Sequence, residues 1–96
     1  MSELEILNYT RSCFAHFKKR ARERYKFVLN EFDVCEIALM ICNGNGVLKA
    51  NLQKGRKLVK LKYRGRMLSI VWDPFLQCPV TVLPHRALKS YSNVRL

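Results

Sequence analysis

Apolar residues recur at intervals of three and four in the first third of the chain. They fall at Phe14, Phe17, Ala21, Tyr25 and Val28. This spacing is typical of a helix with one apolar face. It predicts a helix over residues 10–28, begun by Thr10 or Ser12, because a hydroxyl oxygen can accept from the unpaired N–H groups of a first turn.

A second helix is predicted from residue 30 to about residue 42. Asn30 is a good N-cap, and the acids that follow it suit the positive end of a helix dipole. One apolar stripe consists of Val34, Ile37, Ala38 and Ile41. A second apolar side consists of Cys35, Leu39 and Cys42. We expect this helix to be buried broadly, with the alternative that its second side docks a protein partner.

From Val47 onward the apolar pattern changes to a period of two, which is typical of strands. Strands are expected at residues 47–53, 58–64, 67–72 and 79–83, separated by Gly-containing and Pro-containing turns. The last strand is short enough to lie at a sheet edge. We therefore predict an α+β fold in two layers, with two N-terminal helices packed on a three- to four-stranded antiparallel sheet. Residues 1–96 form one domain in this prediction, with a core at about 10–84 and a basic tail at 85–96.

Charge suggests the kind of partner. The chain has 18 Lys and Arg against 7 Asp and Glu, a formal net charge of +11. Self-repulsion of this size opposes compaction, so we expect a polyanionic partner, with nucleic acid ahead of an anionic membrane surface. There is neither a basic N-terminal segment followed by an apolar run nor a stretch of eighteen apolar residues, which predicts a cytoplasmic protein.

The four cysteines carry no motif of their own. They are Cys13, Cys35, Cys42 and Cys78. None forms a C-x-x-C pair that would start a zinc site or a redox motif, and most have apolar neighbours. We expect all four to be buried free thiols.

His16, Arg20 and Arg24 are spaced four residues apart, so their side chains lie along one line beside the apolar stripe of the first helix. Such a row can hold phosphates. Histidine has an ordinary pKa near neutrality and can act as general acid or base, while a guanidinium stabilises charge developing on a phosphate. RNA supplies its own nucleophile, the 2′-hydroxyl, so cleavage needs no metal and no cofactor. The alternative is an exposed basic helix face that carries one incidental histidine.

A second cationic surface is predicted on the sheet, because residues two apart on a strand share a face. Its members are Lys49, Lys60, Lys62, Arg64 and Arg66. Acidic residues are almost absent from residues 47–72, which favours RNA backbone binding over a merely solvated sheet face.

Three later positions complete the candidate site. Thr81 can donate from its hydroxyl to a phosphate oxygen, although threonine is also an ordinary strand former. His85 is a candidate second acid or base and Arg86 a further phosphate contact, with a surface loop as the alternative. Tyr63 and Trp72 are candidates for stacking on unpaired bases, but Trp72 follows an apolar run and is expected in the core.

The order of these segments resembles small RelE-like toxin domains, a group that unites RelE toxins with barnase-like, EndoU-like and colicin-type ribonucleases. The resemblance covers about residues 12–84. It rests on Ala15-His16 with Arg20 and Arg24 in a first helix and on Asp33-Val34 opening a second helix that ends near Gly44. The closing segments are Lys60 to Gly65, Leu68 to Asp73 and Val80 to Pro84.

The resemblance implies metal-independent cleavage of mRNA or tRNA, in some members on the ribosome. It also implies an antitoxin or immunity protein as partner and an origin in a phage, prophage or toxin–antitoxin system. Site positions typical of the group correspond here to His16, Arg20 and Thr81. The chain lacks the tyrosine found in the group near the end of the last strand, since its late Tyr91 lies beyond the predicted sheet.

Two functional hypotheses follow. The first is a ribonuclease with His16 as general acid or base, Arg20 and Arg24 on the phosphate and Thr81 as a supporting donor. The second is a non-catalytic basic protein that binds nucleic acid or inhibits a host enzyme.

Overall fold

The computed structural model of the protein describes residues 2–84. Its first helix, α1, spans Glu3–Tyr25, and the Ser2 side chain accepts from the backbone N–H of Glu5 at 3.2 Å. The helix therefore begins before the predicted residue 10, and the assignment of Thr10 or Ser12 as N-cap was wrong, because both lie inside it. It ends at Tyr25, before the predicted residue 28, because the C-cap Lys26 has a left-handed backbone with φ of 53°.

The second helix, α2, spans Glu31–Cys42 and confirms the prediction for this segment. Asn30 and Asp33 form a reciprocal capping box. The Asn30 side chain accepts from the backbone N–H of Asp33 at 2.8 Å, and the Asp33 carboxylate accepts from the backbone N–H of Asn30 at 3.0 Å. Two otherwise unpaired donors of the first turn are satisfied in this way.

Four antiparallel strands form one sheet in the order β1-β2-β3-β4. They span Val47–Asn51, Lys57–Tyr63, Arg66–Asp73 and Cys78–Val82. The first strand is shorter than predicted, because the short 3-10 helix η1, Gln53–Gly55, follows it. Between β2 and β3, Arg64 and Gly65 have φ of 50° and 78°, the left-handed pair that a two-residue hairpin turn requires.

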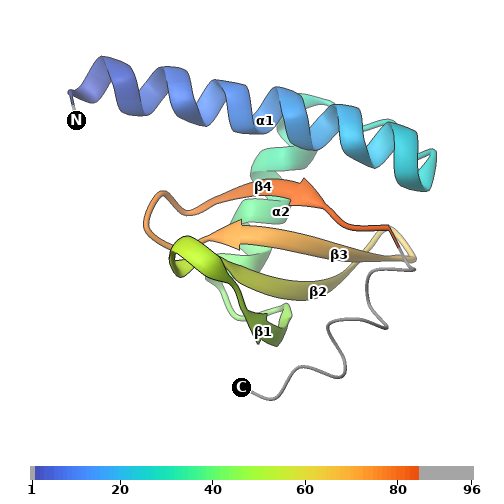
Figure 1. The fold of residues 1–96 in the computed structure, drawn as a ribbon. Coiled ribbons are helices and arrows are strands. Elements are labelled where there is room, and N and C mark those ends of the chain that lie inside the picture. The colour runs from blue at the N-terminus through green and yellow to red at the C-terminus, as the bar shows by residue number, and fades with distance from the viewer. Residues whose placement is uncertain (1, 85–96) are drawn as a thin grey trace.

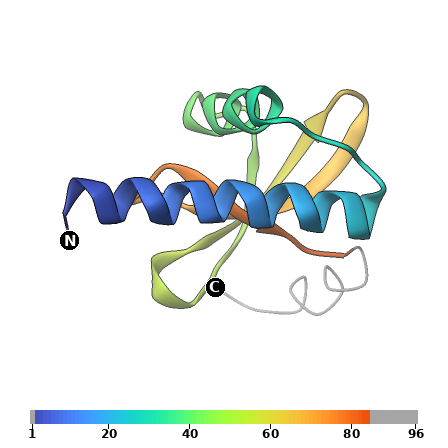
Figure 2. The same cartoon turned by 90° about the horizontal axis from the view of Figure 1, so that it is seen from above.

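The two helices occupy different places on the sheet (Figures 1 and 2). α1 runs alongside β4, at one edge of the sheet, and α2 lies behind the sheet in the view of Figure 1. The two-layer α+β arrangement is as predicted, and the edge position of the last strand is confirmed. Within residues 2–84, neither helix has the length and apolar character needed to cross a membrane.

The core lies where α1 and α2 meet the sheet. Phe17 of α1, Ile37 of α2 and Ile70 of β3 are all fully buried in it. Trp72 is buried, as predicted. Tyr63 is buried too, with 2% of its surface exposed, so it is not available to stack on a base.

The cysteines divide into two kinds. Cys13 and Cys78 are buried free thiols, and burial raises the pKa of the Cys78 thiol to about 12. Cys35 and Cys42 are exposed, so the prediction that all four are buried was wrong. The reason is that α2 buries its other apolar stripe, with Val34 and Ile37 in the core.

Candidate nucleic-acid interface

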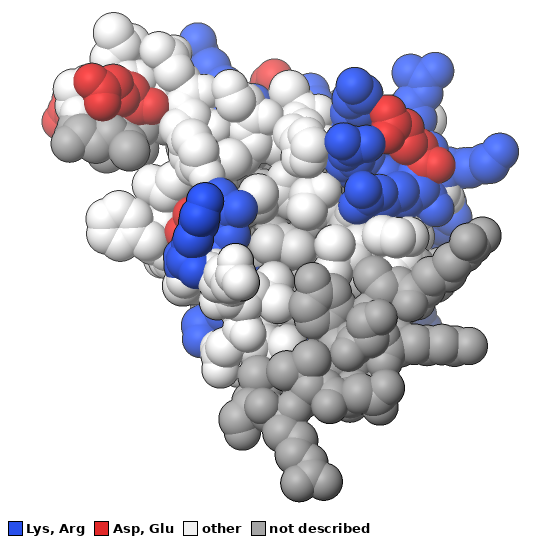
Figure 3. Space-filling view, viewed as in Figure 1, with Lys and Arg blue, Asp and Glu red and all other residues white. Residues whose placement is uncertain are grey.

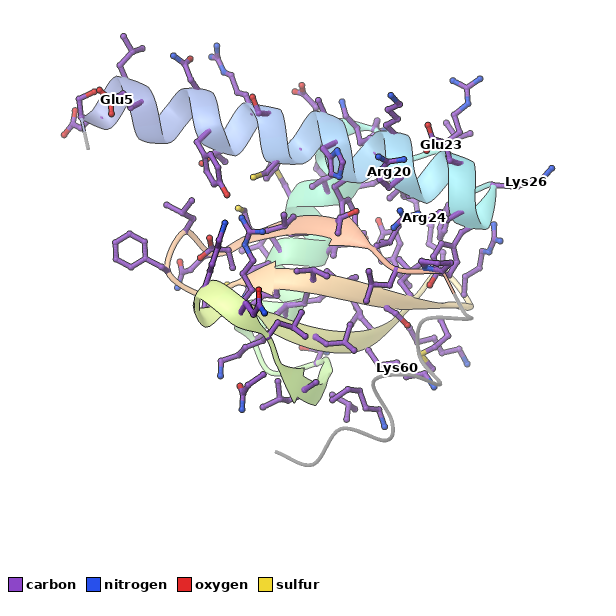
Figure 4. The ribbon with its side chains drawn as sticks, viewed as in Figure 1. Glu5, Arg20, Glu23, Arg24, Lys26 and Lys60 are labelled. Atoms are coloured by element: carbon purple, nitrogen blue, oxygen red, sulfur yellow. The ribbon has the colours of Figure 1, made fainter. Side chains whose placement is uncertain are left out.

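Cations line both edges of the C-terminal half of α1, on either side of its buried stripe. His16, Arg20 and Arg24 follow one another on the edge toward β4, where Arg24 contacts that strand. The opposite edge carries Lys18, Arg22 and Lys26. Lys19 and Glu23 lie on the exposed ridge between the two rows. Figure 3 shows Lys and Arg gathered over this half of α1, and Figure 4 labels Arg20, Arg24 and Lys26 on it.

On the edge toward β4, two predicted site residues meet at one backbone carbonyl. Nη1 of Arg24 donates to the carbonyl oxygen of Val82 at 2.5 Å, and the Thr81 hydroxyl is 3.5 Å from the same oxygen. Arg20 instead forms an exposed ion pair with Glu23, with 2.8 Å between Nη1 and Oε2. An exposed pair of this kind contributes little to stability, so the Arg20 side chain can be recruited by a phosphate.

His16 is exposed on α1, and its pKa is lowered below its ordinary value. Partial desolvation is the largest cause, followed by the positive charges of Arg20, Arg24 and Lys19. Each of these disfavours the imidazolium form. His16 is therefore mainly neutral at pH 7, the form that can accept a proton.

On the opposite edge, the α1 side chains and the connection to α2 enclose a shallow depression of about 600 Å³. Its lining residues are Lys18, Lys19, Arg22, Glu23, Val28 and Leu29. Val28 is 75% exposed, so cationic and apolar surface lie side by side here. Lys18 is 3.9 Å from the exposed carboxylate of Glu31. A pair this loose does not neutralise the positive charge of Lys18.

The strand cations do not form the single surface that was predicted. Leu61 and Tyr63 point into the core with α2, so Lys60 and Lys62 lie on the other face of the sheet. Lys62 is exposed and Lys60 half-buried. Figure 4 places Lys60 on the sheet, well apart from the labelled cations of α1. Lys49 is exposed on β1, the opposite edge strand from β4.

Arg64 and Arg66 turn toward the helices instead of continuing the row of strand lysines. Nη2 of Arg64 is 2.5 Å from Oδ1 of Asp33, and its guanidinium lies 5.1 Å from the centre of the Tyr63 ring. Arg66 donates to the carbonyl oxygen of Tyr25 and lies 5.0 Å from the centre of the Phe27 ring. Both side chains thus hold the β2–β3 hairpin to the helices.

A further cationic group surrounds η1. It comprises Lys54, Arg56 and Lys57. Arg56 Nη2 donates to the Tyr9 hydroxyl at 2.7 Å, which ties this turn to α1. In Figure 3 the blue side chains over η1 and those over the C-terminal half of α1 are separated by uncharged surface.

The sequence analysis predicted a site on the α1 edge with His16, Arg20 and Arg24, but not on the opposite edge. The spacing of Lys18, Arg22 and Lys26 could have indicated that second row of cations. The depression beside it could not be predicted, because it depends on how the α1–α2 connection folds back. His85 and Arg86 lie outside the described residues, so their predicted roles are not tested. Among residues 2–84, no three His, Cys, Asp or Glu side chains gather closely enough to hold a metal ion.

Comparisons with protein-family models, with curated proteins and with solved structures gave no match to this chain. The resemblance to RelE-like domains therefore stays a prediction based on the order and spacing of residues.

Proposed function

We propose that the protein binds the phosphodiester backbone of RNA through the C-terminal half of α1. The observation that carries this proposal is the pair of cation rows on the two edges of one helix. Residues four apart on a helix are separated by about 6 Å along its axis. Arg20 and Arg24 on one edge, and Lys18 and Arg22 on the other, therefore present charges at regular steps to an extended polyanion. Each phosphate contacted releases condensed counterions, which drives binding at low salt.

The depression beside Lys18 and Arg22 supports this location over the sheet. Among the described residues, Lys18 and Arg22 form no ion pair shorter than 3.9 Å, whereas Arg64 and Arg66 are engaged by Asp33 and by backbone and aromatic groups. Cations that already satisfy partners of their own chain must give them up before they bind phosphate. The α1 edge toward α2 avoids this cost.

The test compares two double variants with the same change of charge. Lys18→Glu with Arg22→Glu should weaken binding of a single-stranded RNA oligonucleotide by about tenfold or more, measured by fluorescence anisotropy. The slope of log K against log salt should shrink by about 1.4, since each single-strand phosphate contact contributes about 0.7. Lys60→Glu with Lys62→Glu is the control, and it should change both quantities much less.

An equal loss in both double variants would mean that only net charge matters, and would contradict the assignment to α1. A DNA oligonucleotide of the same sequence gives the preference for RNA. Preference for DNA would reject RNA as the ligand.

Metal-independent RNA cleavage at the same helix is the second candidate function. The observation that favours it is the position of exposed His16 one helical turn from Arg20 on the same edge of α1, together with its lowered pKa. In this mechanism neutral His16 takes the proton of the 2′-hydroxyl as that oxygen attacks the adjacent phosphorus. Arg20 stabilises the developing charge, and the 5′-oxygen leaves and takes a proton from water, giving a 2′,3′-cyclic phosphate. The protonated His16 then returns its proton to the solvent.

Cleavage is tested in the presence of EDTA, with the end groups of the products analysed. His16→Ala should abolish cleavage while RNA binding stays within about twofold of the original. Product formation at the original rate by His16→Ala would reject cleavage by His16 and leave the binding function standing.

A further inference from the structure

A second depression lies where η1 connects β1 to β2. It has a volume of about 560 Å³, and its polar lining residues are Asn51, Gln53, Lys54 and Arg56. Figure 1 shows η1 at the end of the sheet opposite the C-terminal half of α1, so this depression is distinct from the proposed RNA-binding rows. Its residues have no part in the function proposed above.

The side chains of this depression are held in place by their own chain. Nη2 of Arg56 donates to the Tyr9 hydroxyl at 2.7 Å, a neutral partner that orients the guanidinium without cancelling its charge. Nζ of Lys57 donates to Oδ1 of Asn51 at 2.9 Å, so the amide nitrogen of Asn51 is the group left to bind a ligand. The turn is closed by a backbone hydrogen bond from the N–H of Leu52 to the carbonyl of Arg56 at 2.7 Å. A ligand therefore binds here with a smaller loss of conformational entropy.

These polar groups are mostly hydrogen-bond donors, so they favour an anion. Lys54 contributes an ammonium, Arg56 a guanidinium and Asn51 an amide N–H. None of the described lining residues is acidic, and the carboxylate of Asp73, at the end of β3, accepts from N–H groups of the β3–β4 turn. Two cations and an amide match a phosphomonoester, which carries about 1.5 to 2 negative charges at pH 7 and three acceptor oxygens.

An apolar floor adjoins these donors. It consists of Ala50, Leu52 and Val71. Ala50 pairs with Leu58, which pairs with Val71, so the side chains of Ala50 and Val71 share one face of the sheet. Inorganic phosphate alone would leave this floor in water, and a sugar phosphate would place hydroxyl groups on it. A nucleobase instead offers a flat face that packs on apolar side chains, and Gln53 has both a donor and an acceptor for the edge of the base.

We propose that the depression beside η1 binds a nucleoside monophosphate, with the phosphate on Lys54, Arg56 and the Asn51 amide and the base on the apolar floor. Two sources share this chemistry, a free nucleotide and the 5′-phosphate end of an RNA strand. The site is independent of RNA binding at α1, because different residues form it and a mononucleotide tests it.

The test is a titration of the whole chain with adenosine 5′-monophosphate at pH 7, followed by two-dimensional amide NMR. Signals of residues 50–57 should shift and saturate. Asn51→Asp should weaken binding by about tenfold or more, because it replaces the amide donor by a negative charge and keeps the acceptor for Lys57. Asn45→Asp is the matched control, with the same change of charge at an exposed position outside the depression, and should bind within about twofold of the original.

A second variant removes a positive charge instead. Lys54→Asn should weaken binding by about fivefold or more, and asparagine tolerates the left-handed backbone of Lys54, which has φ of 61°. Lys62→Asn removes the same charge from an exposed position of β2 and should change binding by less than about twofold. Circular dichroism of each variant confirms that it is folded.

Further ligands separate the two parts of the site and the two sources. Inorganic phosphate and adenosine should each bind about tenfold or more weakly than the mononucleotide, since each occupies one part only. A 5′-phosphorylated RNA trinucleotide that binds more tightly than the mononucleotide assigns the site to an RNA end, and weaker binding assigns it to free nucleotides. Equal affinities of folded Asn51→Asp and Asn45→Asp, inorganic phosphate binding as tightly as the mononucleotide, or shifts confined to α1 would overturn the proposal.

Discussion

Asp33 is the residue that joins three parts of the fold. Its carboxylate accepts from the backbone N–H of Asn30, from the Tyr63 hydroxyl at 3.1 Å and from Arg64 at 2.5 Å. It thus caps α2 and holds the β2–β3 hairpin beside it. The hydrogen bond from Asn30, followed by those from Tyr63 and Arg64, holds the pKa of Asp33 below its ordinary value of 3.8.

A depressed pKa in the folded state means that the charged carboxylate stabilises the fold. This contribution is fully present above the pKa that Asp33 has in the unfolded chain, and it is lost as pH falls through the lower folded value. We expect Asp33→Asn to lower the urea midpoint at pH 7. The gap between variant and original should close as pH falls below 3.8. Glu31→Gln removes the same charge from the exposed side of the same turn and should change stability at pH 7 by less than about 0.5 kcal/mol.

The C-terminal end of α1 is held by a residue type that is unusual at this position. Lys26 adopts the left-handed conformation at the helix C-terminus, where its backbone N–H reaches the carbonyls of Ala21 and Arg22. This conformation costs a residue with a Cβ about 1 kcal/mol or more of folding free energy, and it costs glycine almost none.

Lys26→Gly should therefore stabilise the protein by about 1 kcal/mol in urea unfolding, because the hydrogen bonds of the cap belong to the backbone and are kept. Lys19→Gly is the matched control. It removes the same charge from an exposed position inside α1 and should destabilise by about 1 kcal/mol. If both variants lose stability, the left-handed residue is not a source of strain.

The elements also show what the sequence could and could not predict. α2 and the strands follow from periodicity, and Asn30 marks the start of α2 correctly. The start of α1 was missed although Ser2 with Glu5 three residues later is the signature of a capping box. The exposure of Cys35 was not predictable from α2 alone, because two apolar stripes of similar strength compete and only packing decides between them.

The sequence predicts the candidate site only in part, because packing between distant segments decides which cations stay free. Spacing on one helix predicts that Arg20 and Arg24 share an edge. It cannot predict that Arg24 reaches Val82, which is 58 residues later, or that Arg64 turns back to Asp33. Contacts between distant segments depend on the order in which strands pair, and a local sequence pattern does not predict that order.

For the whole molecule, net charge acts in opposite directions on folding and on binding. Eighteen cations on 96 residues repel one another in the compact state, and salt screens that repulsion. The same salt competes with the protein for phosphates.

Raising NaCl from about 0.05 to about 0.5 M should therefore raise the melting temperature while lowering RNA affinity. For a domain of this size, a gain of about 1 kcal/mol corresponds to about 4–8 °C, measured by circular dichroism. A melting temperature that falls with added NaCl would show that attractive ion pairs outweigh the repulsion.

The packing of α1 on β4 has a consequence for synthesis of the chain. Tyr25 donates to the carbonyl oxygen of Leu83 at 2.5 Å, so the first helix finds its partner strand among the last residues that the structure describes. A ribosome adds about 5–20 residues per second. The nascent α1 therefore spends several seconds outside the exit tunnel with its apolar face exposed, before β4 has been synthesised. Because ribosomal RNA is the polyanion nearest to a nascent chain, we expect the cations of α1 to bind it during that interval.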